Sequence, residues 1–207
     1  MKYIRFFIAL VISLVPINKI RVLLYKTIFK YKIDKSYIGW LSIIVVKKAY
    51  IQEAYIGKFN LFKGNFTLIL NKKSSIDKLN SFISGNWADN NSIFKQTITI
   101  GKGVLITKKH YFDVSGEISI GDNSFIGGIR SQFWTHGSLK EDTNISIGND
   151  CYISSGSKFA PGSSIANMTL VALGSVVSGK FLEEKVLIGG NPAKVIKTNI
   201  YWRDSWV

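Results

Sequence analysis

Two histidines are the residues of this chain best suited to acid–base chemistry near neutral pH. They are His110 and His136, and the 207 residues contain no others. An unperturbed imidazole has a pKa of about 6.5, so it can take a proton from a weak nucleophile such as a hydroxyl group. Asp113 follows His110 by three residues and offers a carboxylate that can orient an imidazole. The spacing does not decide whether Asp113 would serve His110 or the His136 of a neighbouring chain.

The position of His136 in the sequence favours it as the general base. Apolar residues recur every six positions through most of the chain, but this pattern stops at Gln132 and resumes at Ile147. A scaffold of this kind displays functional side chains where the chain leaves it for a loop. We therefore predict that His136 is the base, with His110 and Asp113 as further catalytic residues. The alternatives are histidines bonded to nearby backbone and an aspartate that only forms a turn.

The six-residue repeat predicts the fold. Neither the 3.6-residue period of a helix nor the alternation of a hairpin explains it, whereas short repeats of this length are typical of a parallel β-helix. Three units then form one triangular coil, each repeating residue points inward, and stacked coils stabilise one another. The repeating residues are Ile38, Ile44, Tyr50, Ile56, Phe62 and Leu68, then Leu70, Ile76 and Phe82, then Ile100, Ile106, Phe112 and Ile118, then Ile120, Ile126 and Gln132, and finally Ile147, Ile153, Phe159, Ile165, Val171 and Val177.

The repeat and the segments around it predict three parts of the chain. Residues 1–37 form a basic amphipathic helical segment, and residues 38–185 form the parallel β-helix. Loops interrupt the β-helix near residues 84–98 and 137–146, where the repeat breaks. Residues 186–207 form a C-terminal strand and tail.

The N-terminal segment carries half of the net charge of +14. Residues 1–37 contain eight cations and one acid, Asp34, which gives 8 − 1 = +7. The apolar run over residues 3–15 ends at Pro16, so it is short for a membrane-spanning helix, and no small-residue cleavage site marks a signal peptide. Two interpretations remain compatible with each other. Residues 1–35 lie on an anionic bilayer, or they pack against the β-helix and cap one end.

The rest of the chain excludes several classes of protein. It is only mildly basic and has no arginine–aromatic cluster, so we expect no nucleic-acid partner. Cys151 is the single cysteine and cannot form an internal disulfide, so nothing indicates an oxidising compartment. We expect a cytoplasmic protein, at the inner face of the membrane if the N-terminal segment binds lipid.

The end of the repeat carries a resemblance to a known family. The hexapeptide pattern followed by Ile188-Gly189-Gly190-Asn191-Pro192-Ala193-Lys194 resembles the left-handed β-helix acyltransferases, over residues 38–197. The nearest likeness is to the sugar O-acetyltransferases of bacterial surface-polysaccharide gene clusters. Those proteins tend to carry a pair like Thr135-His136 and a His-x-x-Asp run like the one from His110 to Asp113. The fold implied is an all-β, left-handed parallel β-helix.

The resemblance also implies an activity and its partners. The activity is transfer of an acetyl group from acetyl-CoA to a sugar hydroxyl in the biosynthesis of a capsule, O-antigen or exopolysaccharide. The acceptor would be a sugar or a lipid-linked glycan, the protein would be a homotrimer, and no metal would take part. The residues that match the coenzyme site of the family are Ser155, Gly174, Ser175, Pro192, Ala193 and Lys194.

Three rival functions share this fold. An N-acetyltransferase acting on a nucleotide-linked amino sugar would need the same scaffold. A non-catalytic scaffold would explain the repeat, but it would leave the Pro-Ala-Lys segment and the loop histidine unexplained. A γ-class carbonic anhydrase needs three histidines on one zinc ion, and with two histidines per chain we set it aside.

Overall fold

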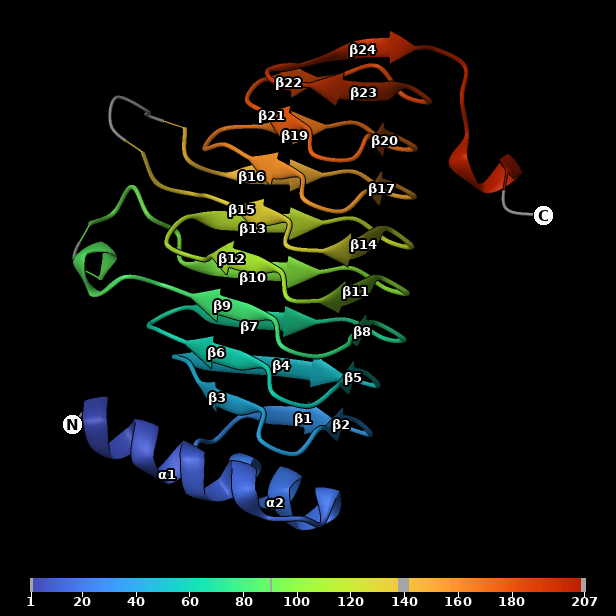
Figure 1. Cartoon of the computed structure of the whole chain (residues 1–207). Helices are drawn as coiled ribbons and strands as arrows, with labels where there is room; N and C mark the ends of the chain where they lie inside the picture. Colours follow the sequence, from blue (N-terminus) through green and yellow to red (C-terminus); the bar gives the residue numbers. More distant parts are fainter. Residues whose placement is uncertain (1, 90, 138–141, 206–207) are drawn as a thin grey trace.

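The computed structural model describes residues 2–89, 91–137 and 142–205. Within them the chain forms a column of stacked coils with two α-helices across one end (Figure 1). Three parallel sheets make the sides of the column, and each coil contributes one strand to each sheet in turn. The predicted parallel β-helix with an N-terminal helical segment is therefore confirmed.

The three sheets are named here A, B and C in chain order. Sheet A contains β1 (Lys32–Asp34), β4 (Lys48–Gln52), β7 (Thr67–Leu70), β10 (Thr97–Ile100), β13 (Glu117–Ile120), β16 (Ile145–Ile147), β19 (Ser164–Ile165) and β22 (Lys180–Phe181). Sheet B contains β2 (Tyr37–Ile38), β5 (Tyr55–Ile56), β8 (Ser75–Ile76), β11 (Leu105–Lys108), β14 (Phe125–Ile129), β17 (Tyr152–Ile153), β20 (Leu170–Val171), β23 (Leu187–Gly190) and the antiparallel β24 (Ala193–Lys197). Sheet C contains β3 (Ile43–Val45), β6 (Leu61–Lys63), β9 (Ser81–Ile83), β12 (Tyr111–Asp113), β15 (Gln132–Phe133), β18 (Lys158–Phe159) and β21 (Val176–Val177).

The shifts of two in the sequence repeat arise from sheet A. Its middle strands are longer than most strands of the other sheets and point two side chains inward. In β10 both Ile98 and Ile100 are buried, and they pair in register with Ile118 and Ile120 of β13. Successive side chains of a strand point to opposite faces, so residues two apart share the core. The positions of the six-residue repeat therefore shift by two residues at each of these strands.

Two of the predicted inward positions are wrong by one residue. Tyr50 lies on the outer surface, while its neighbours Ala49 and Ile51 are the buried pair of β4. Gln132 is half-buried, and Phe133 fills the core instead. An irregularity in the pairing of β11 with β14 adds one residue to this coil, and a count in sixes cannot register it.

Sheet C fills the core with a stack of phenylalanine rings. One ring lies above the next along the column, with centroids 4.5 to 5.0 Å apart, through Phe62, Phe82, Phe112, Phe133 and Phe159. Stacked pairs of this kind contribute about 0.5–1.5 kcal/mol each beyond the apolar area that they bury. The stack fixes the vertical register of sheet C, whose strand ends carry the candidate site.

The β-helix begins before the boundary at residue 38 that the repeat predicts. In β1, Ile33 is buried and pairs with Ile51 of β4. Ile33 is a single inward residue between Lys32 and Asp34 and does not belong to the six-residue repeat. The prediction from the sequence therefore placed this strand in the basic segment. At the other end, β23 still pairs in parallel with β20, and β24 then turns back to cover it.

The two helices pack across the first coil and cap the column. Helix α1 (Lys2–Leu14) and helix α2 (Asn18–Ile28) are separated by a turn at Pro16, as the sequence predicts. Ala9 and Ile12 from α1 and Tyr25 from α2 join the hydrophobic core. The packing predicted for the N-terminal segment is therefore present in the structure.

Side chains from this cap bind the exposed backbone edge of the first coil. The Tyr25 hydroxyl accepts a hydrogen bond from the Ile44 N–H at 3.1 Å, and the Tyr31 hydroxyl accepts one from the Val46 N–H at 2.9 Å. The buried guanidinium of Arg21 donates to the carbonyls of Ile38 and Val15. Unpaired edge strands recruit other chains, so these bonds both stabilise the end and block that pairing.

The cap predicts a specific loss of stability. Replacing Tyr25 with Phe leaves the buried N–H of Ile44 without its acceptor, and we expect the free energy of unfolding to fall by about 1–3 kcal/mol. Denaturant unfolding followed by circular dichroism measures the change. The control is Tyr3→Phe, because the Tyr3 side chain is 92% exposed. This substitution should change the free energy of unfolding by less than about 0.5 kcal/mol. Equal stability of the two variants would contradict the role given to the hydroxyl.

Candidate active site

The candidate site lies on one edge of the column, where the chain passes from sheet C to sheet A. After β12 this passage takes only residues 114–116, but after β9 it takes residues 84–96 and after β15 residues 134–144. The described residues of both long passages lie on the same side of the column (Figure 1). They flank the short corner that begins at Asp113, and residues 138–141 of the second one lie outside the described residues.

Asp113 and His136 form a hydrogen-bonded pair within one chain. Asp113 Oδ2 lies 2.6 Å from His136 Nδ1. The side chain of Asp113 is 4% exposed and that of His136 is 41% exposed. A carboxylate can only accept, so Nδ1 carries a proton, and in the neutral form of the imidazole Nε2 has a lone pair. The pair has the arrangement of a base and its orienting carboxylate.

Four further hydrogen bonds fix the Asp113 carboxylate. Ser115 donates to Oδ1 from its hydroxyl at 2.7 Å and from its N–H at 3.3 Å. The Thr135 N–H donates to Oδ2 at 2.9 Å, and the Thr135 hydroxyl lies 3.0 Å from the same oxygen. Carboxylates held in this way keep one orientation, so the imidazole of His136 is held as well. Ser115 was not predicted from the sequence, where an Asp-x-Ser run was the only signal for it.

Two tryptophans border His136. The Trp87 ring lies 5.1 Å from the His136 ring and the Trp134 ring lies 5.7 Å from it, both edge-on. Trp87 belongs to the 3₁₀ helix η1 (Asn86–Ala88) in the first long passage. A Cβ atom at Gly85 would collide with the Trp87 indole, so a side chain at that position would displace the indole from its present place. Sequence reasoning missed Trp87, since it lies in a polar stretch without a repeat.

The first long passage is tied to the same corner that holds Asp113. The Gly85 N–H donates to the Ser115 hydroxyl at 3.3 Å, and the Gln96 N–H donates to the Ser115 carbonyl at the same distance. The Gln96 amide then donates to Ser84 and Asp89 across the passage. Ser115 therefore links the position of Trp87 to the position of the Asp113 carboxylate.

The structure does not bring His110 together with this pair. His110 precedes β12 and Asp113 ends it, so the two residues lie at opposite ends of the strand. The buried His110 ring accepts a bond from the Ser131 N–H at Nδ1, and its Nε2 lies 2.9 Å from the Thr107 hydroxyl. Burial lowers the pKa of His110 to about 4, so its ring is neutral near pH 7. Both ring nitrogens are engaged within the scaffold.

The predicted coenzyme residues gather along a different edge, where the chain passes from sheet B to sheet C. Ser155 and Gly174 lie one above the other there, joined by a bond from the Gly174 N–H to the Ser155 carbonyl. The hydroxyls of Ser155 and Ser175 donate to the carbonyls of Ile129 and Ala172. Pro192, Ala193 and Lys194 form the turn and start of the hairpin between β23 and β24, which covers the same end of the column.

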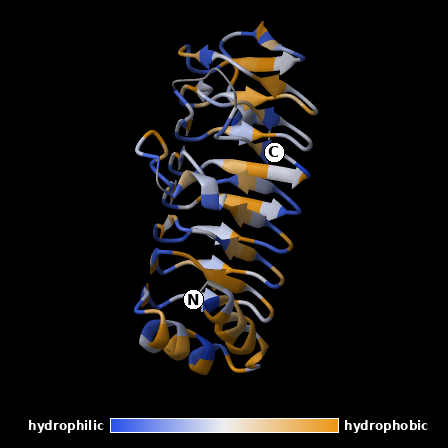
Figure 2. Cartoon of the chain, turned by 90° about the vertical axis from the view of Figure 1, so that its left-hand side faces the viewer, coloured by the Kyte–Doolittle hydropathy of each residue, from blue (hydrophilic) through white to orange (hydrophobic). Residues whose placement is uncertain are grey.

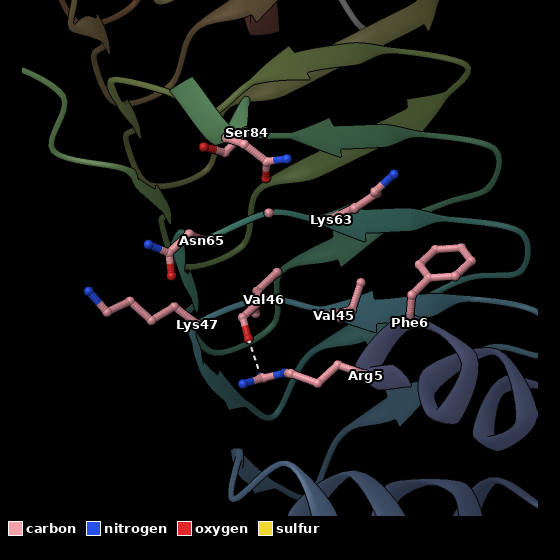
Figure 3. A pocket seen from close by; sticks show the side chains of 10 residues that line it. Arg5, Phe6, Val45, Val46, Lys47, Lys63, Asn65 and Ser84 are labelled. Carbon is pink, nitrogen blue, oxygen red and sulfur yellow. Dashed lines mark hydrogen bonds between the residues drawn. The ribbon is translucent and has the colours of Figure 1, made fainter. Parts of the chain in front are cut away.

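A pocket of about 220 Å³ opens on the edge that carries His136, beside the cap. Figure 3 shows cations on opposite sides of it, with Arg5 bound to the Val46 carbonyl. Its other walls come from the passages that follow β3, β6 and β9. The lining residues are Arg5, Phe6, Val45, Val46, Lys47, Lys63, Gly64, Asn65, Ser84 and Asn86.

The geometry of the pair predicts the tautomer of His136. Nitrogen NMR of the labelled protein should show the proton on Nδ1 in the neutral imidazole, because the Asp113 carboxylate accepts it. In Asp113→Asn the amide can donate as well as accept, and we expect that preference to be lost. The matched control is Glu117→Gln, which removes a partly exposed carboxylate paired with Lys95. An unchanged tautomer in Asp113→Asn would show that the carboxylate does not set it.

Comparison with known proteins gives the wider setting of this geometry. No protein-family model matches the sequence, and no curated protein matches it. Among solved structures, the polysialic acid O-acetyltransferase OatWY is 18% identical, with 83% of each chain covered and a TM-score of 0.57. The polysialic-acid-specific acetyltransferase NeuO is 16% identical over 83% of each chain, with a TM-score of 0.54.

A third neighbour is a hexapeptide-repeat acetyltransferase from Vibrio cholerae, solved as a complex with acetyl-CoA. It is 18% identical, with 95% of this chain and 86% of that chain covered, and its TM-score is 0.51. At these identities the likeness shows the fold. The chain has the left-handed parallel β-helix of the hexapeptide-repeat acetyltransferases, which confirms the resemblance predicted from its sequence.

Proposed function

We propose that this protein transfers an acetyl group from acetyl-CoA to a hydroxyl group of a glycan. The observation that carries the proposal is the pair formed by a buried, fully bonded Asp113 and a half-exposed His136, 2.6 Å apart. The fold shared with solved acetyltransferases supports acyl transfer as the reaction.

The pair can carry out the proton transfers that this reaction requires. The coenzyme would supply a thioester whose carbonyl carbon is open to attack. His136 Nε2 takes the hydroxyl proton as the acceptor oxygen bonds to that carbon. The Asp113 carboxylate stabilises the imidazolium that forms. When the carbon–sulfur bond breaks, His136 returns the proton to the departing thiolate, and the pair is regenerated.

The edge between sheets B and C has features that fit a long anionic coenzyme. Gly174 has a positive φ and open space where a side chain would stand, so a ligand can approach the backbone there. Lys194 and Lys197 are exposed on β24 and can meet phosphate groups as point charges. We propose that Ser155, Gly174, Ser175, Pro192, Ala193 and Lys194 line the coenzyme site.

The separation of the two edges favours a homotrimer. In a single chain the proposed coenzyme residues and His136 lie at opposite ends of the sheet C strands. A threefold assembly would place one edge of a subunit against a different edge of its neighbour, so that both edges line one groove. We propose this arrangement as the complete site.

The surroundings of His136 favour a carbohydrate acceptor. Trp87 and Trp134 offer apolar ring surface beside a base, which suits the C–H faces and hydroxyls of a sugar. The neighbours OatWY and NeuO are named for polysialic acid, a polysaccharide. We propose that the acceptor belongs to a bacterial surface polysaccharide. Transfer to the amine of a nucleotide-linked sugar is the alternative, and a panel of both acceptor classes decides between them.

Replacement of the base gives the test. We expect His136→Ala to lower the rate of thiol release with a glycan acceptor by roughly 100-fold or more, since general-base catalysis contributes that much. Binding of acetyl-CoA, measured by titration calorimetry, should persist. The matched variant is His110→Gln, which removes the other imidazole and should keep most of the rate once its fold is verified by circular dichroism.

Three results would change the proposal. If His136→Ala retained the rate, the base would be a different group. If folded His110→Gln lost the rate as well, the predicted catalytic role of His110 would stand. If the wild-type protein neither bound nor consumed acetyl-CoA, the proposed activity would be wrong and a non-catalytic scaffold would be the favoured function.

A further inference from the structure

The pocket beside the cap shares an edge of the column with His136. Its walls include Val46 after β3, Lys63 and Asn65 at and after β6, and Ser84 and Asn86 after β9. On that same edge Asp113 ends β12 and His136 follows β15. The backbone joins these levels directly, since the Ser84 N–H donates to the Lys63 carbonyl and the Val114 N–H donates to the Ile83 carbonyl.

The pocket reaches the candidate active site through η1. Asn86 lines the pocket, and the next residue, Trp87, contacts the His136 ring. Coils are stacked at the strand spacing of about 4.8 Å, so the level of Lys63 lies three spacings, or roughly 14 Å, below that of His136. A chain of linked sugars with one hydroxyl at His136 would extend over the pocket.

The chemistry of the pocket selects a type of ligand. Arg5, Lys47 and Lys63 supply three cations, and no acidic residue is among the lining residues. Phe6 and Val45 add an apolar floor, while Asn65 and Asn86 add amide groups that both donate and accept. Cations beside an apolar wall bind a carboxylate or phosphate attached to a sugar ring.

We infer that this pocket is an acceptor subsite for an anionic glycan. It would bind a carboxylate or phosphate group of the acceptor several sugars away from the hydroxyl at His136. The inference rests on the proposed function and assigns a substrate class to it. Binding at this subsite would fix the position of the acceptor along the edge and so determine which hydroxyl meets the base.

Removal of the two exposed lysines tests the subsite. The variant is Lys47→Met with Lys63→Met, which keeps an unbranched side chain only one atom shorter at both positions and removes their charge. The matched control is Lys73→Met with Lys102→Met, which removes the same charge at two exposed lysines on the edge between sheets A and B, away from the proposed groove. Acceptors are oligomers of sialic acid, phosphorylated oligomannose and neutral maltose oligomers, with KM, kcat and calorimetric affinity measured for each.

We expect the double variant to weaken binding of one anionic acceptor by roughly tenfold, with kcat and the KM for acetyl-CoA unchanged. The control variant and the neutral acceptor should show no such loss. The acceptor that loses affinity identifies the group as carboxylate or phosphate. Wild-type affinity of the double variant for both anionic acceptors would overturn the subsite. The proposed function would still stand in that case if His136→Ala abolished activity.

The outer face of the cap carries an independent observation. The sides of α1 and α2 that point away from the column expose Phe7 at 64% and Leu23 at 56%. Their other sides, which include Ala9 and Tyr25, are buried against the first coil. Figure 2 shows apolar and polar residues together on these helices at the end of the column. The exposed apolar residues on this face are Tyr3, Ile4, Phe7, Val11, Leu14, Ile17, Ile20 and Leu23.

Charge decides what covers this face. Lys19 and Lys26 are exposed beside Leu23, and the first acidic residue of the chain is Asp34. A second copy of the same face would bring like charges together, whereas an anionic bilayer offers both apolar depth and opposite charge. In the part of the chain that the structure describes, no helix combines the length and apolarity needed to cross a bilayer.

We propose that the cap docks on an anionic bilayer with both helices lying in its surface. The column would then stand away from the lipid, with the pocket between the bilayer and His136. An acceptor glycan attached to a lipid would cross the pocket on its way to the base. The protein would then lie at the inner face of a bacterial membrane, the location that we expect from the N-terminal charge.

Sedimentation with vesicles tests the docking of the full-length protein. We expect it to sediment with vesicles of phosphatidylglycerol and phosphatidylcholine and not with phosphatidylcholine alone. Phe7→Gln with Leu23→Gln should reduce the bound fraction severalfold, since each lost apolar contact lowers the affinity. The matched control is Leu173→Gln with Leu182→Gln, at exposed leucines on the far coils, which should bind as wild type.

Two outcomes would overturn the docking. One is equal sedimentation of the wild type and the Phe7 and Leu23 double variant. The other is a wild type that binds no vesicles, together with a double variant whose molar mass, measured by light scattering, is lower than that of the wild type. That result would make the face a contact between copies of the chain.

Discussion

Stacking of one coil on the next is the constraint on which the rest of this structure depends. The strands are two to five residues long, and their backbone groups pair with the coils above and below rather than within a coil. No coil can satisfy its own N–H and C=O groups, so stability comes from neighbours, and both ends need a cover. The hydroxyls of Tyr25 and Tyr31 and the guanidinium of Arg21 provide it at one end, and β24 covers sheet B at the other.

The same constraint explains where functional side chains can stand. Insertions within a strand would break the ladder, but insertions at a corner leave the strands in register. The two long passages follow this rule, since both leave sheet C and return to sheet A. Asp113 lies at the level between them, and its carboxylate takes bonds from Ser115 on its own corner and from Thr135 on the next. A short strand therefore holds His136 and Asp113 with little freedom of movement.

Each edge of the column has a different chemical character. The edge between sheets C and A carries the proposed base His136, the two tryptophans and the basic pocket. The edge between sheets B and C carries the residues that match a coenzyme site. The end of the column presents apolar residues and lysines. A glycan acceptor, a coenzyme and a membrane would meet the protein on separate surfaces, with the His136 imidazole where the first two converge in an assembled trimer.

Much of the fold could be read from the sequence, because a period of six residues has one simple structural explanation. The helical segment, the break at Pro16 and the two loops were also accessible, whereas the choice of His136 as the base stays a prediction. Tyr50 and Gln132 show the limit of that reading. The longer strands of sheet A and the irregularity in β14 change the count by one or two residues, and a fixed period cannot record such changes.

Only the tertiary structure decided how the site is assembled. Asp113 is three residues from His110 and 23 from His136, yet its carboxylate bonds His136. One further coil of the chain brings His136 next to Asp113, whereas β12 separates Asp113 from His110 at its other end. Trp87 reaches the same ring from 49 residues away through its own insertion. The sequence determined which residue types were available and the period that stacks them. The stacking register determined which of them meet, since it is set by pairing between coils and not by distance along the chain.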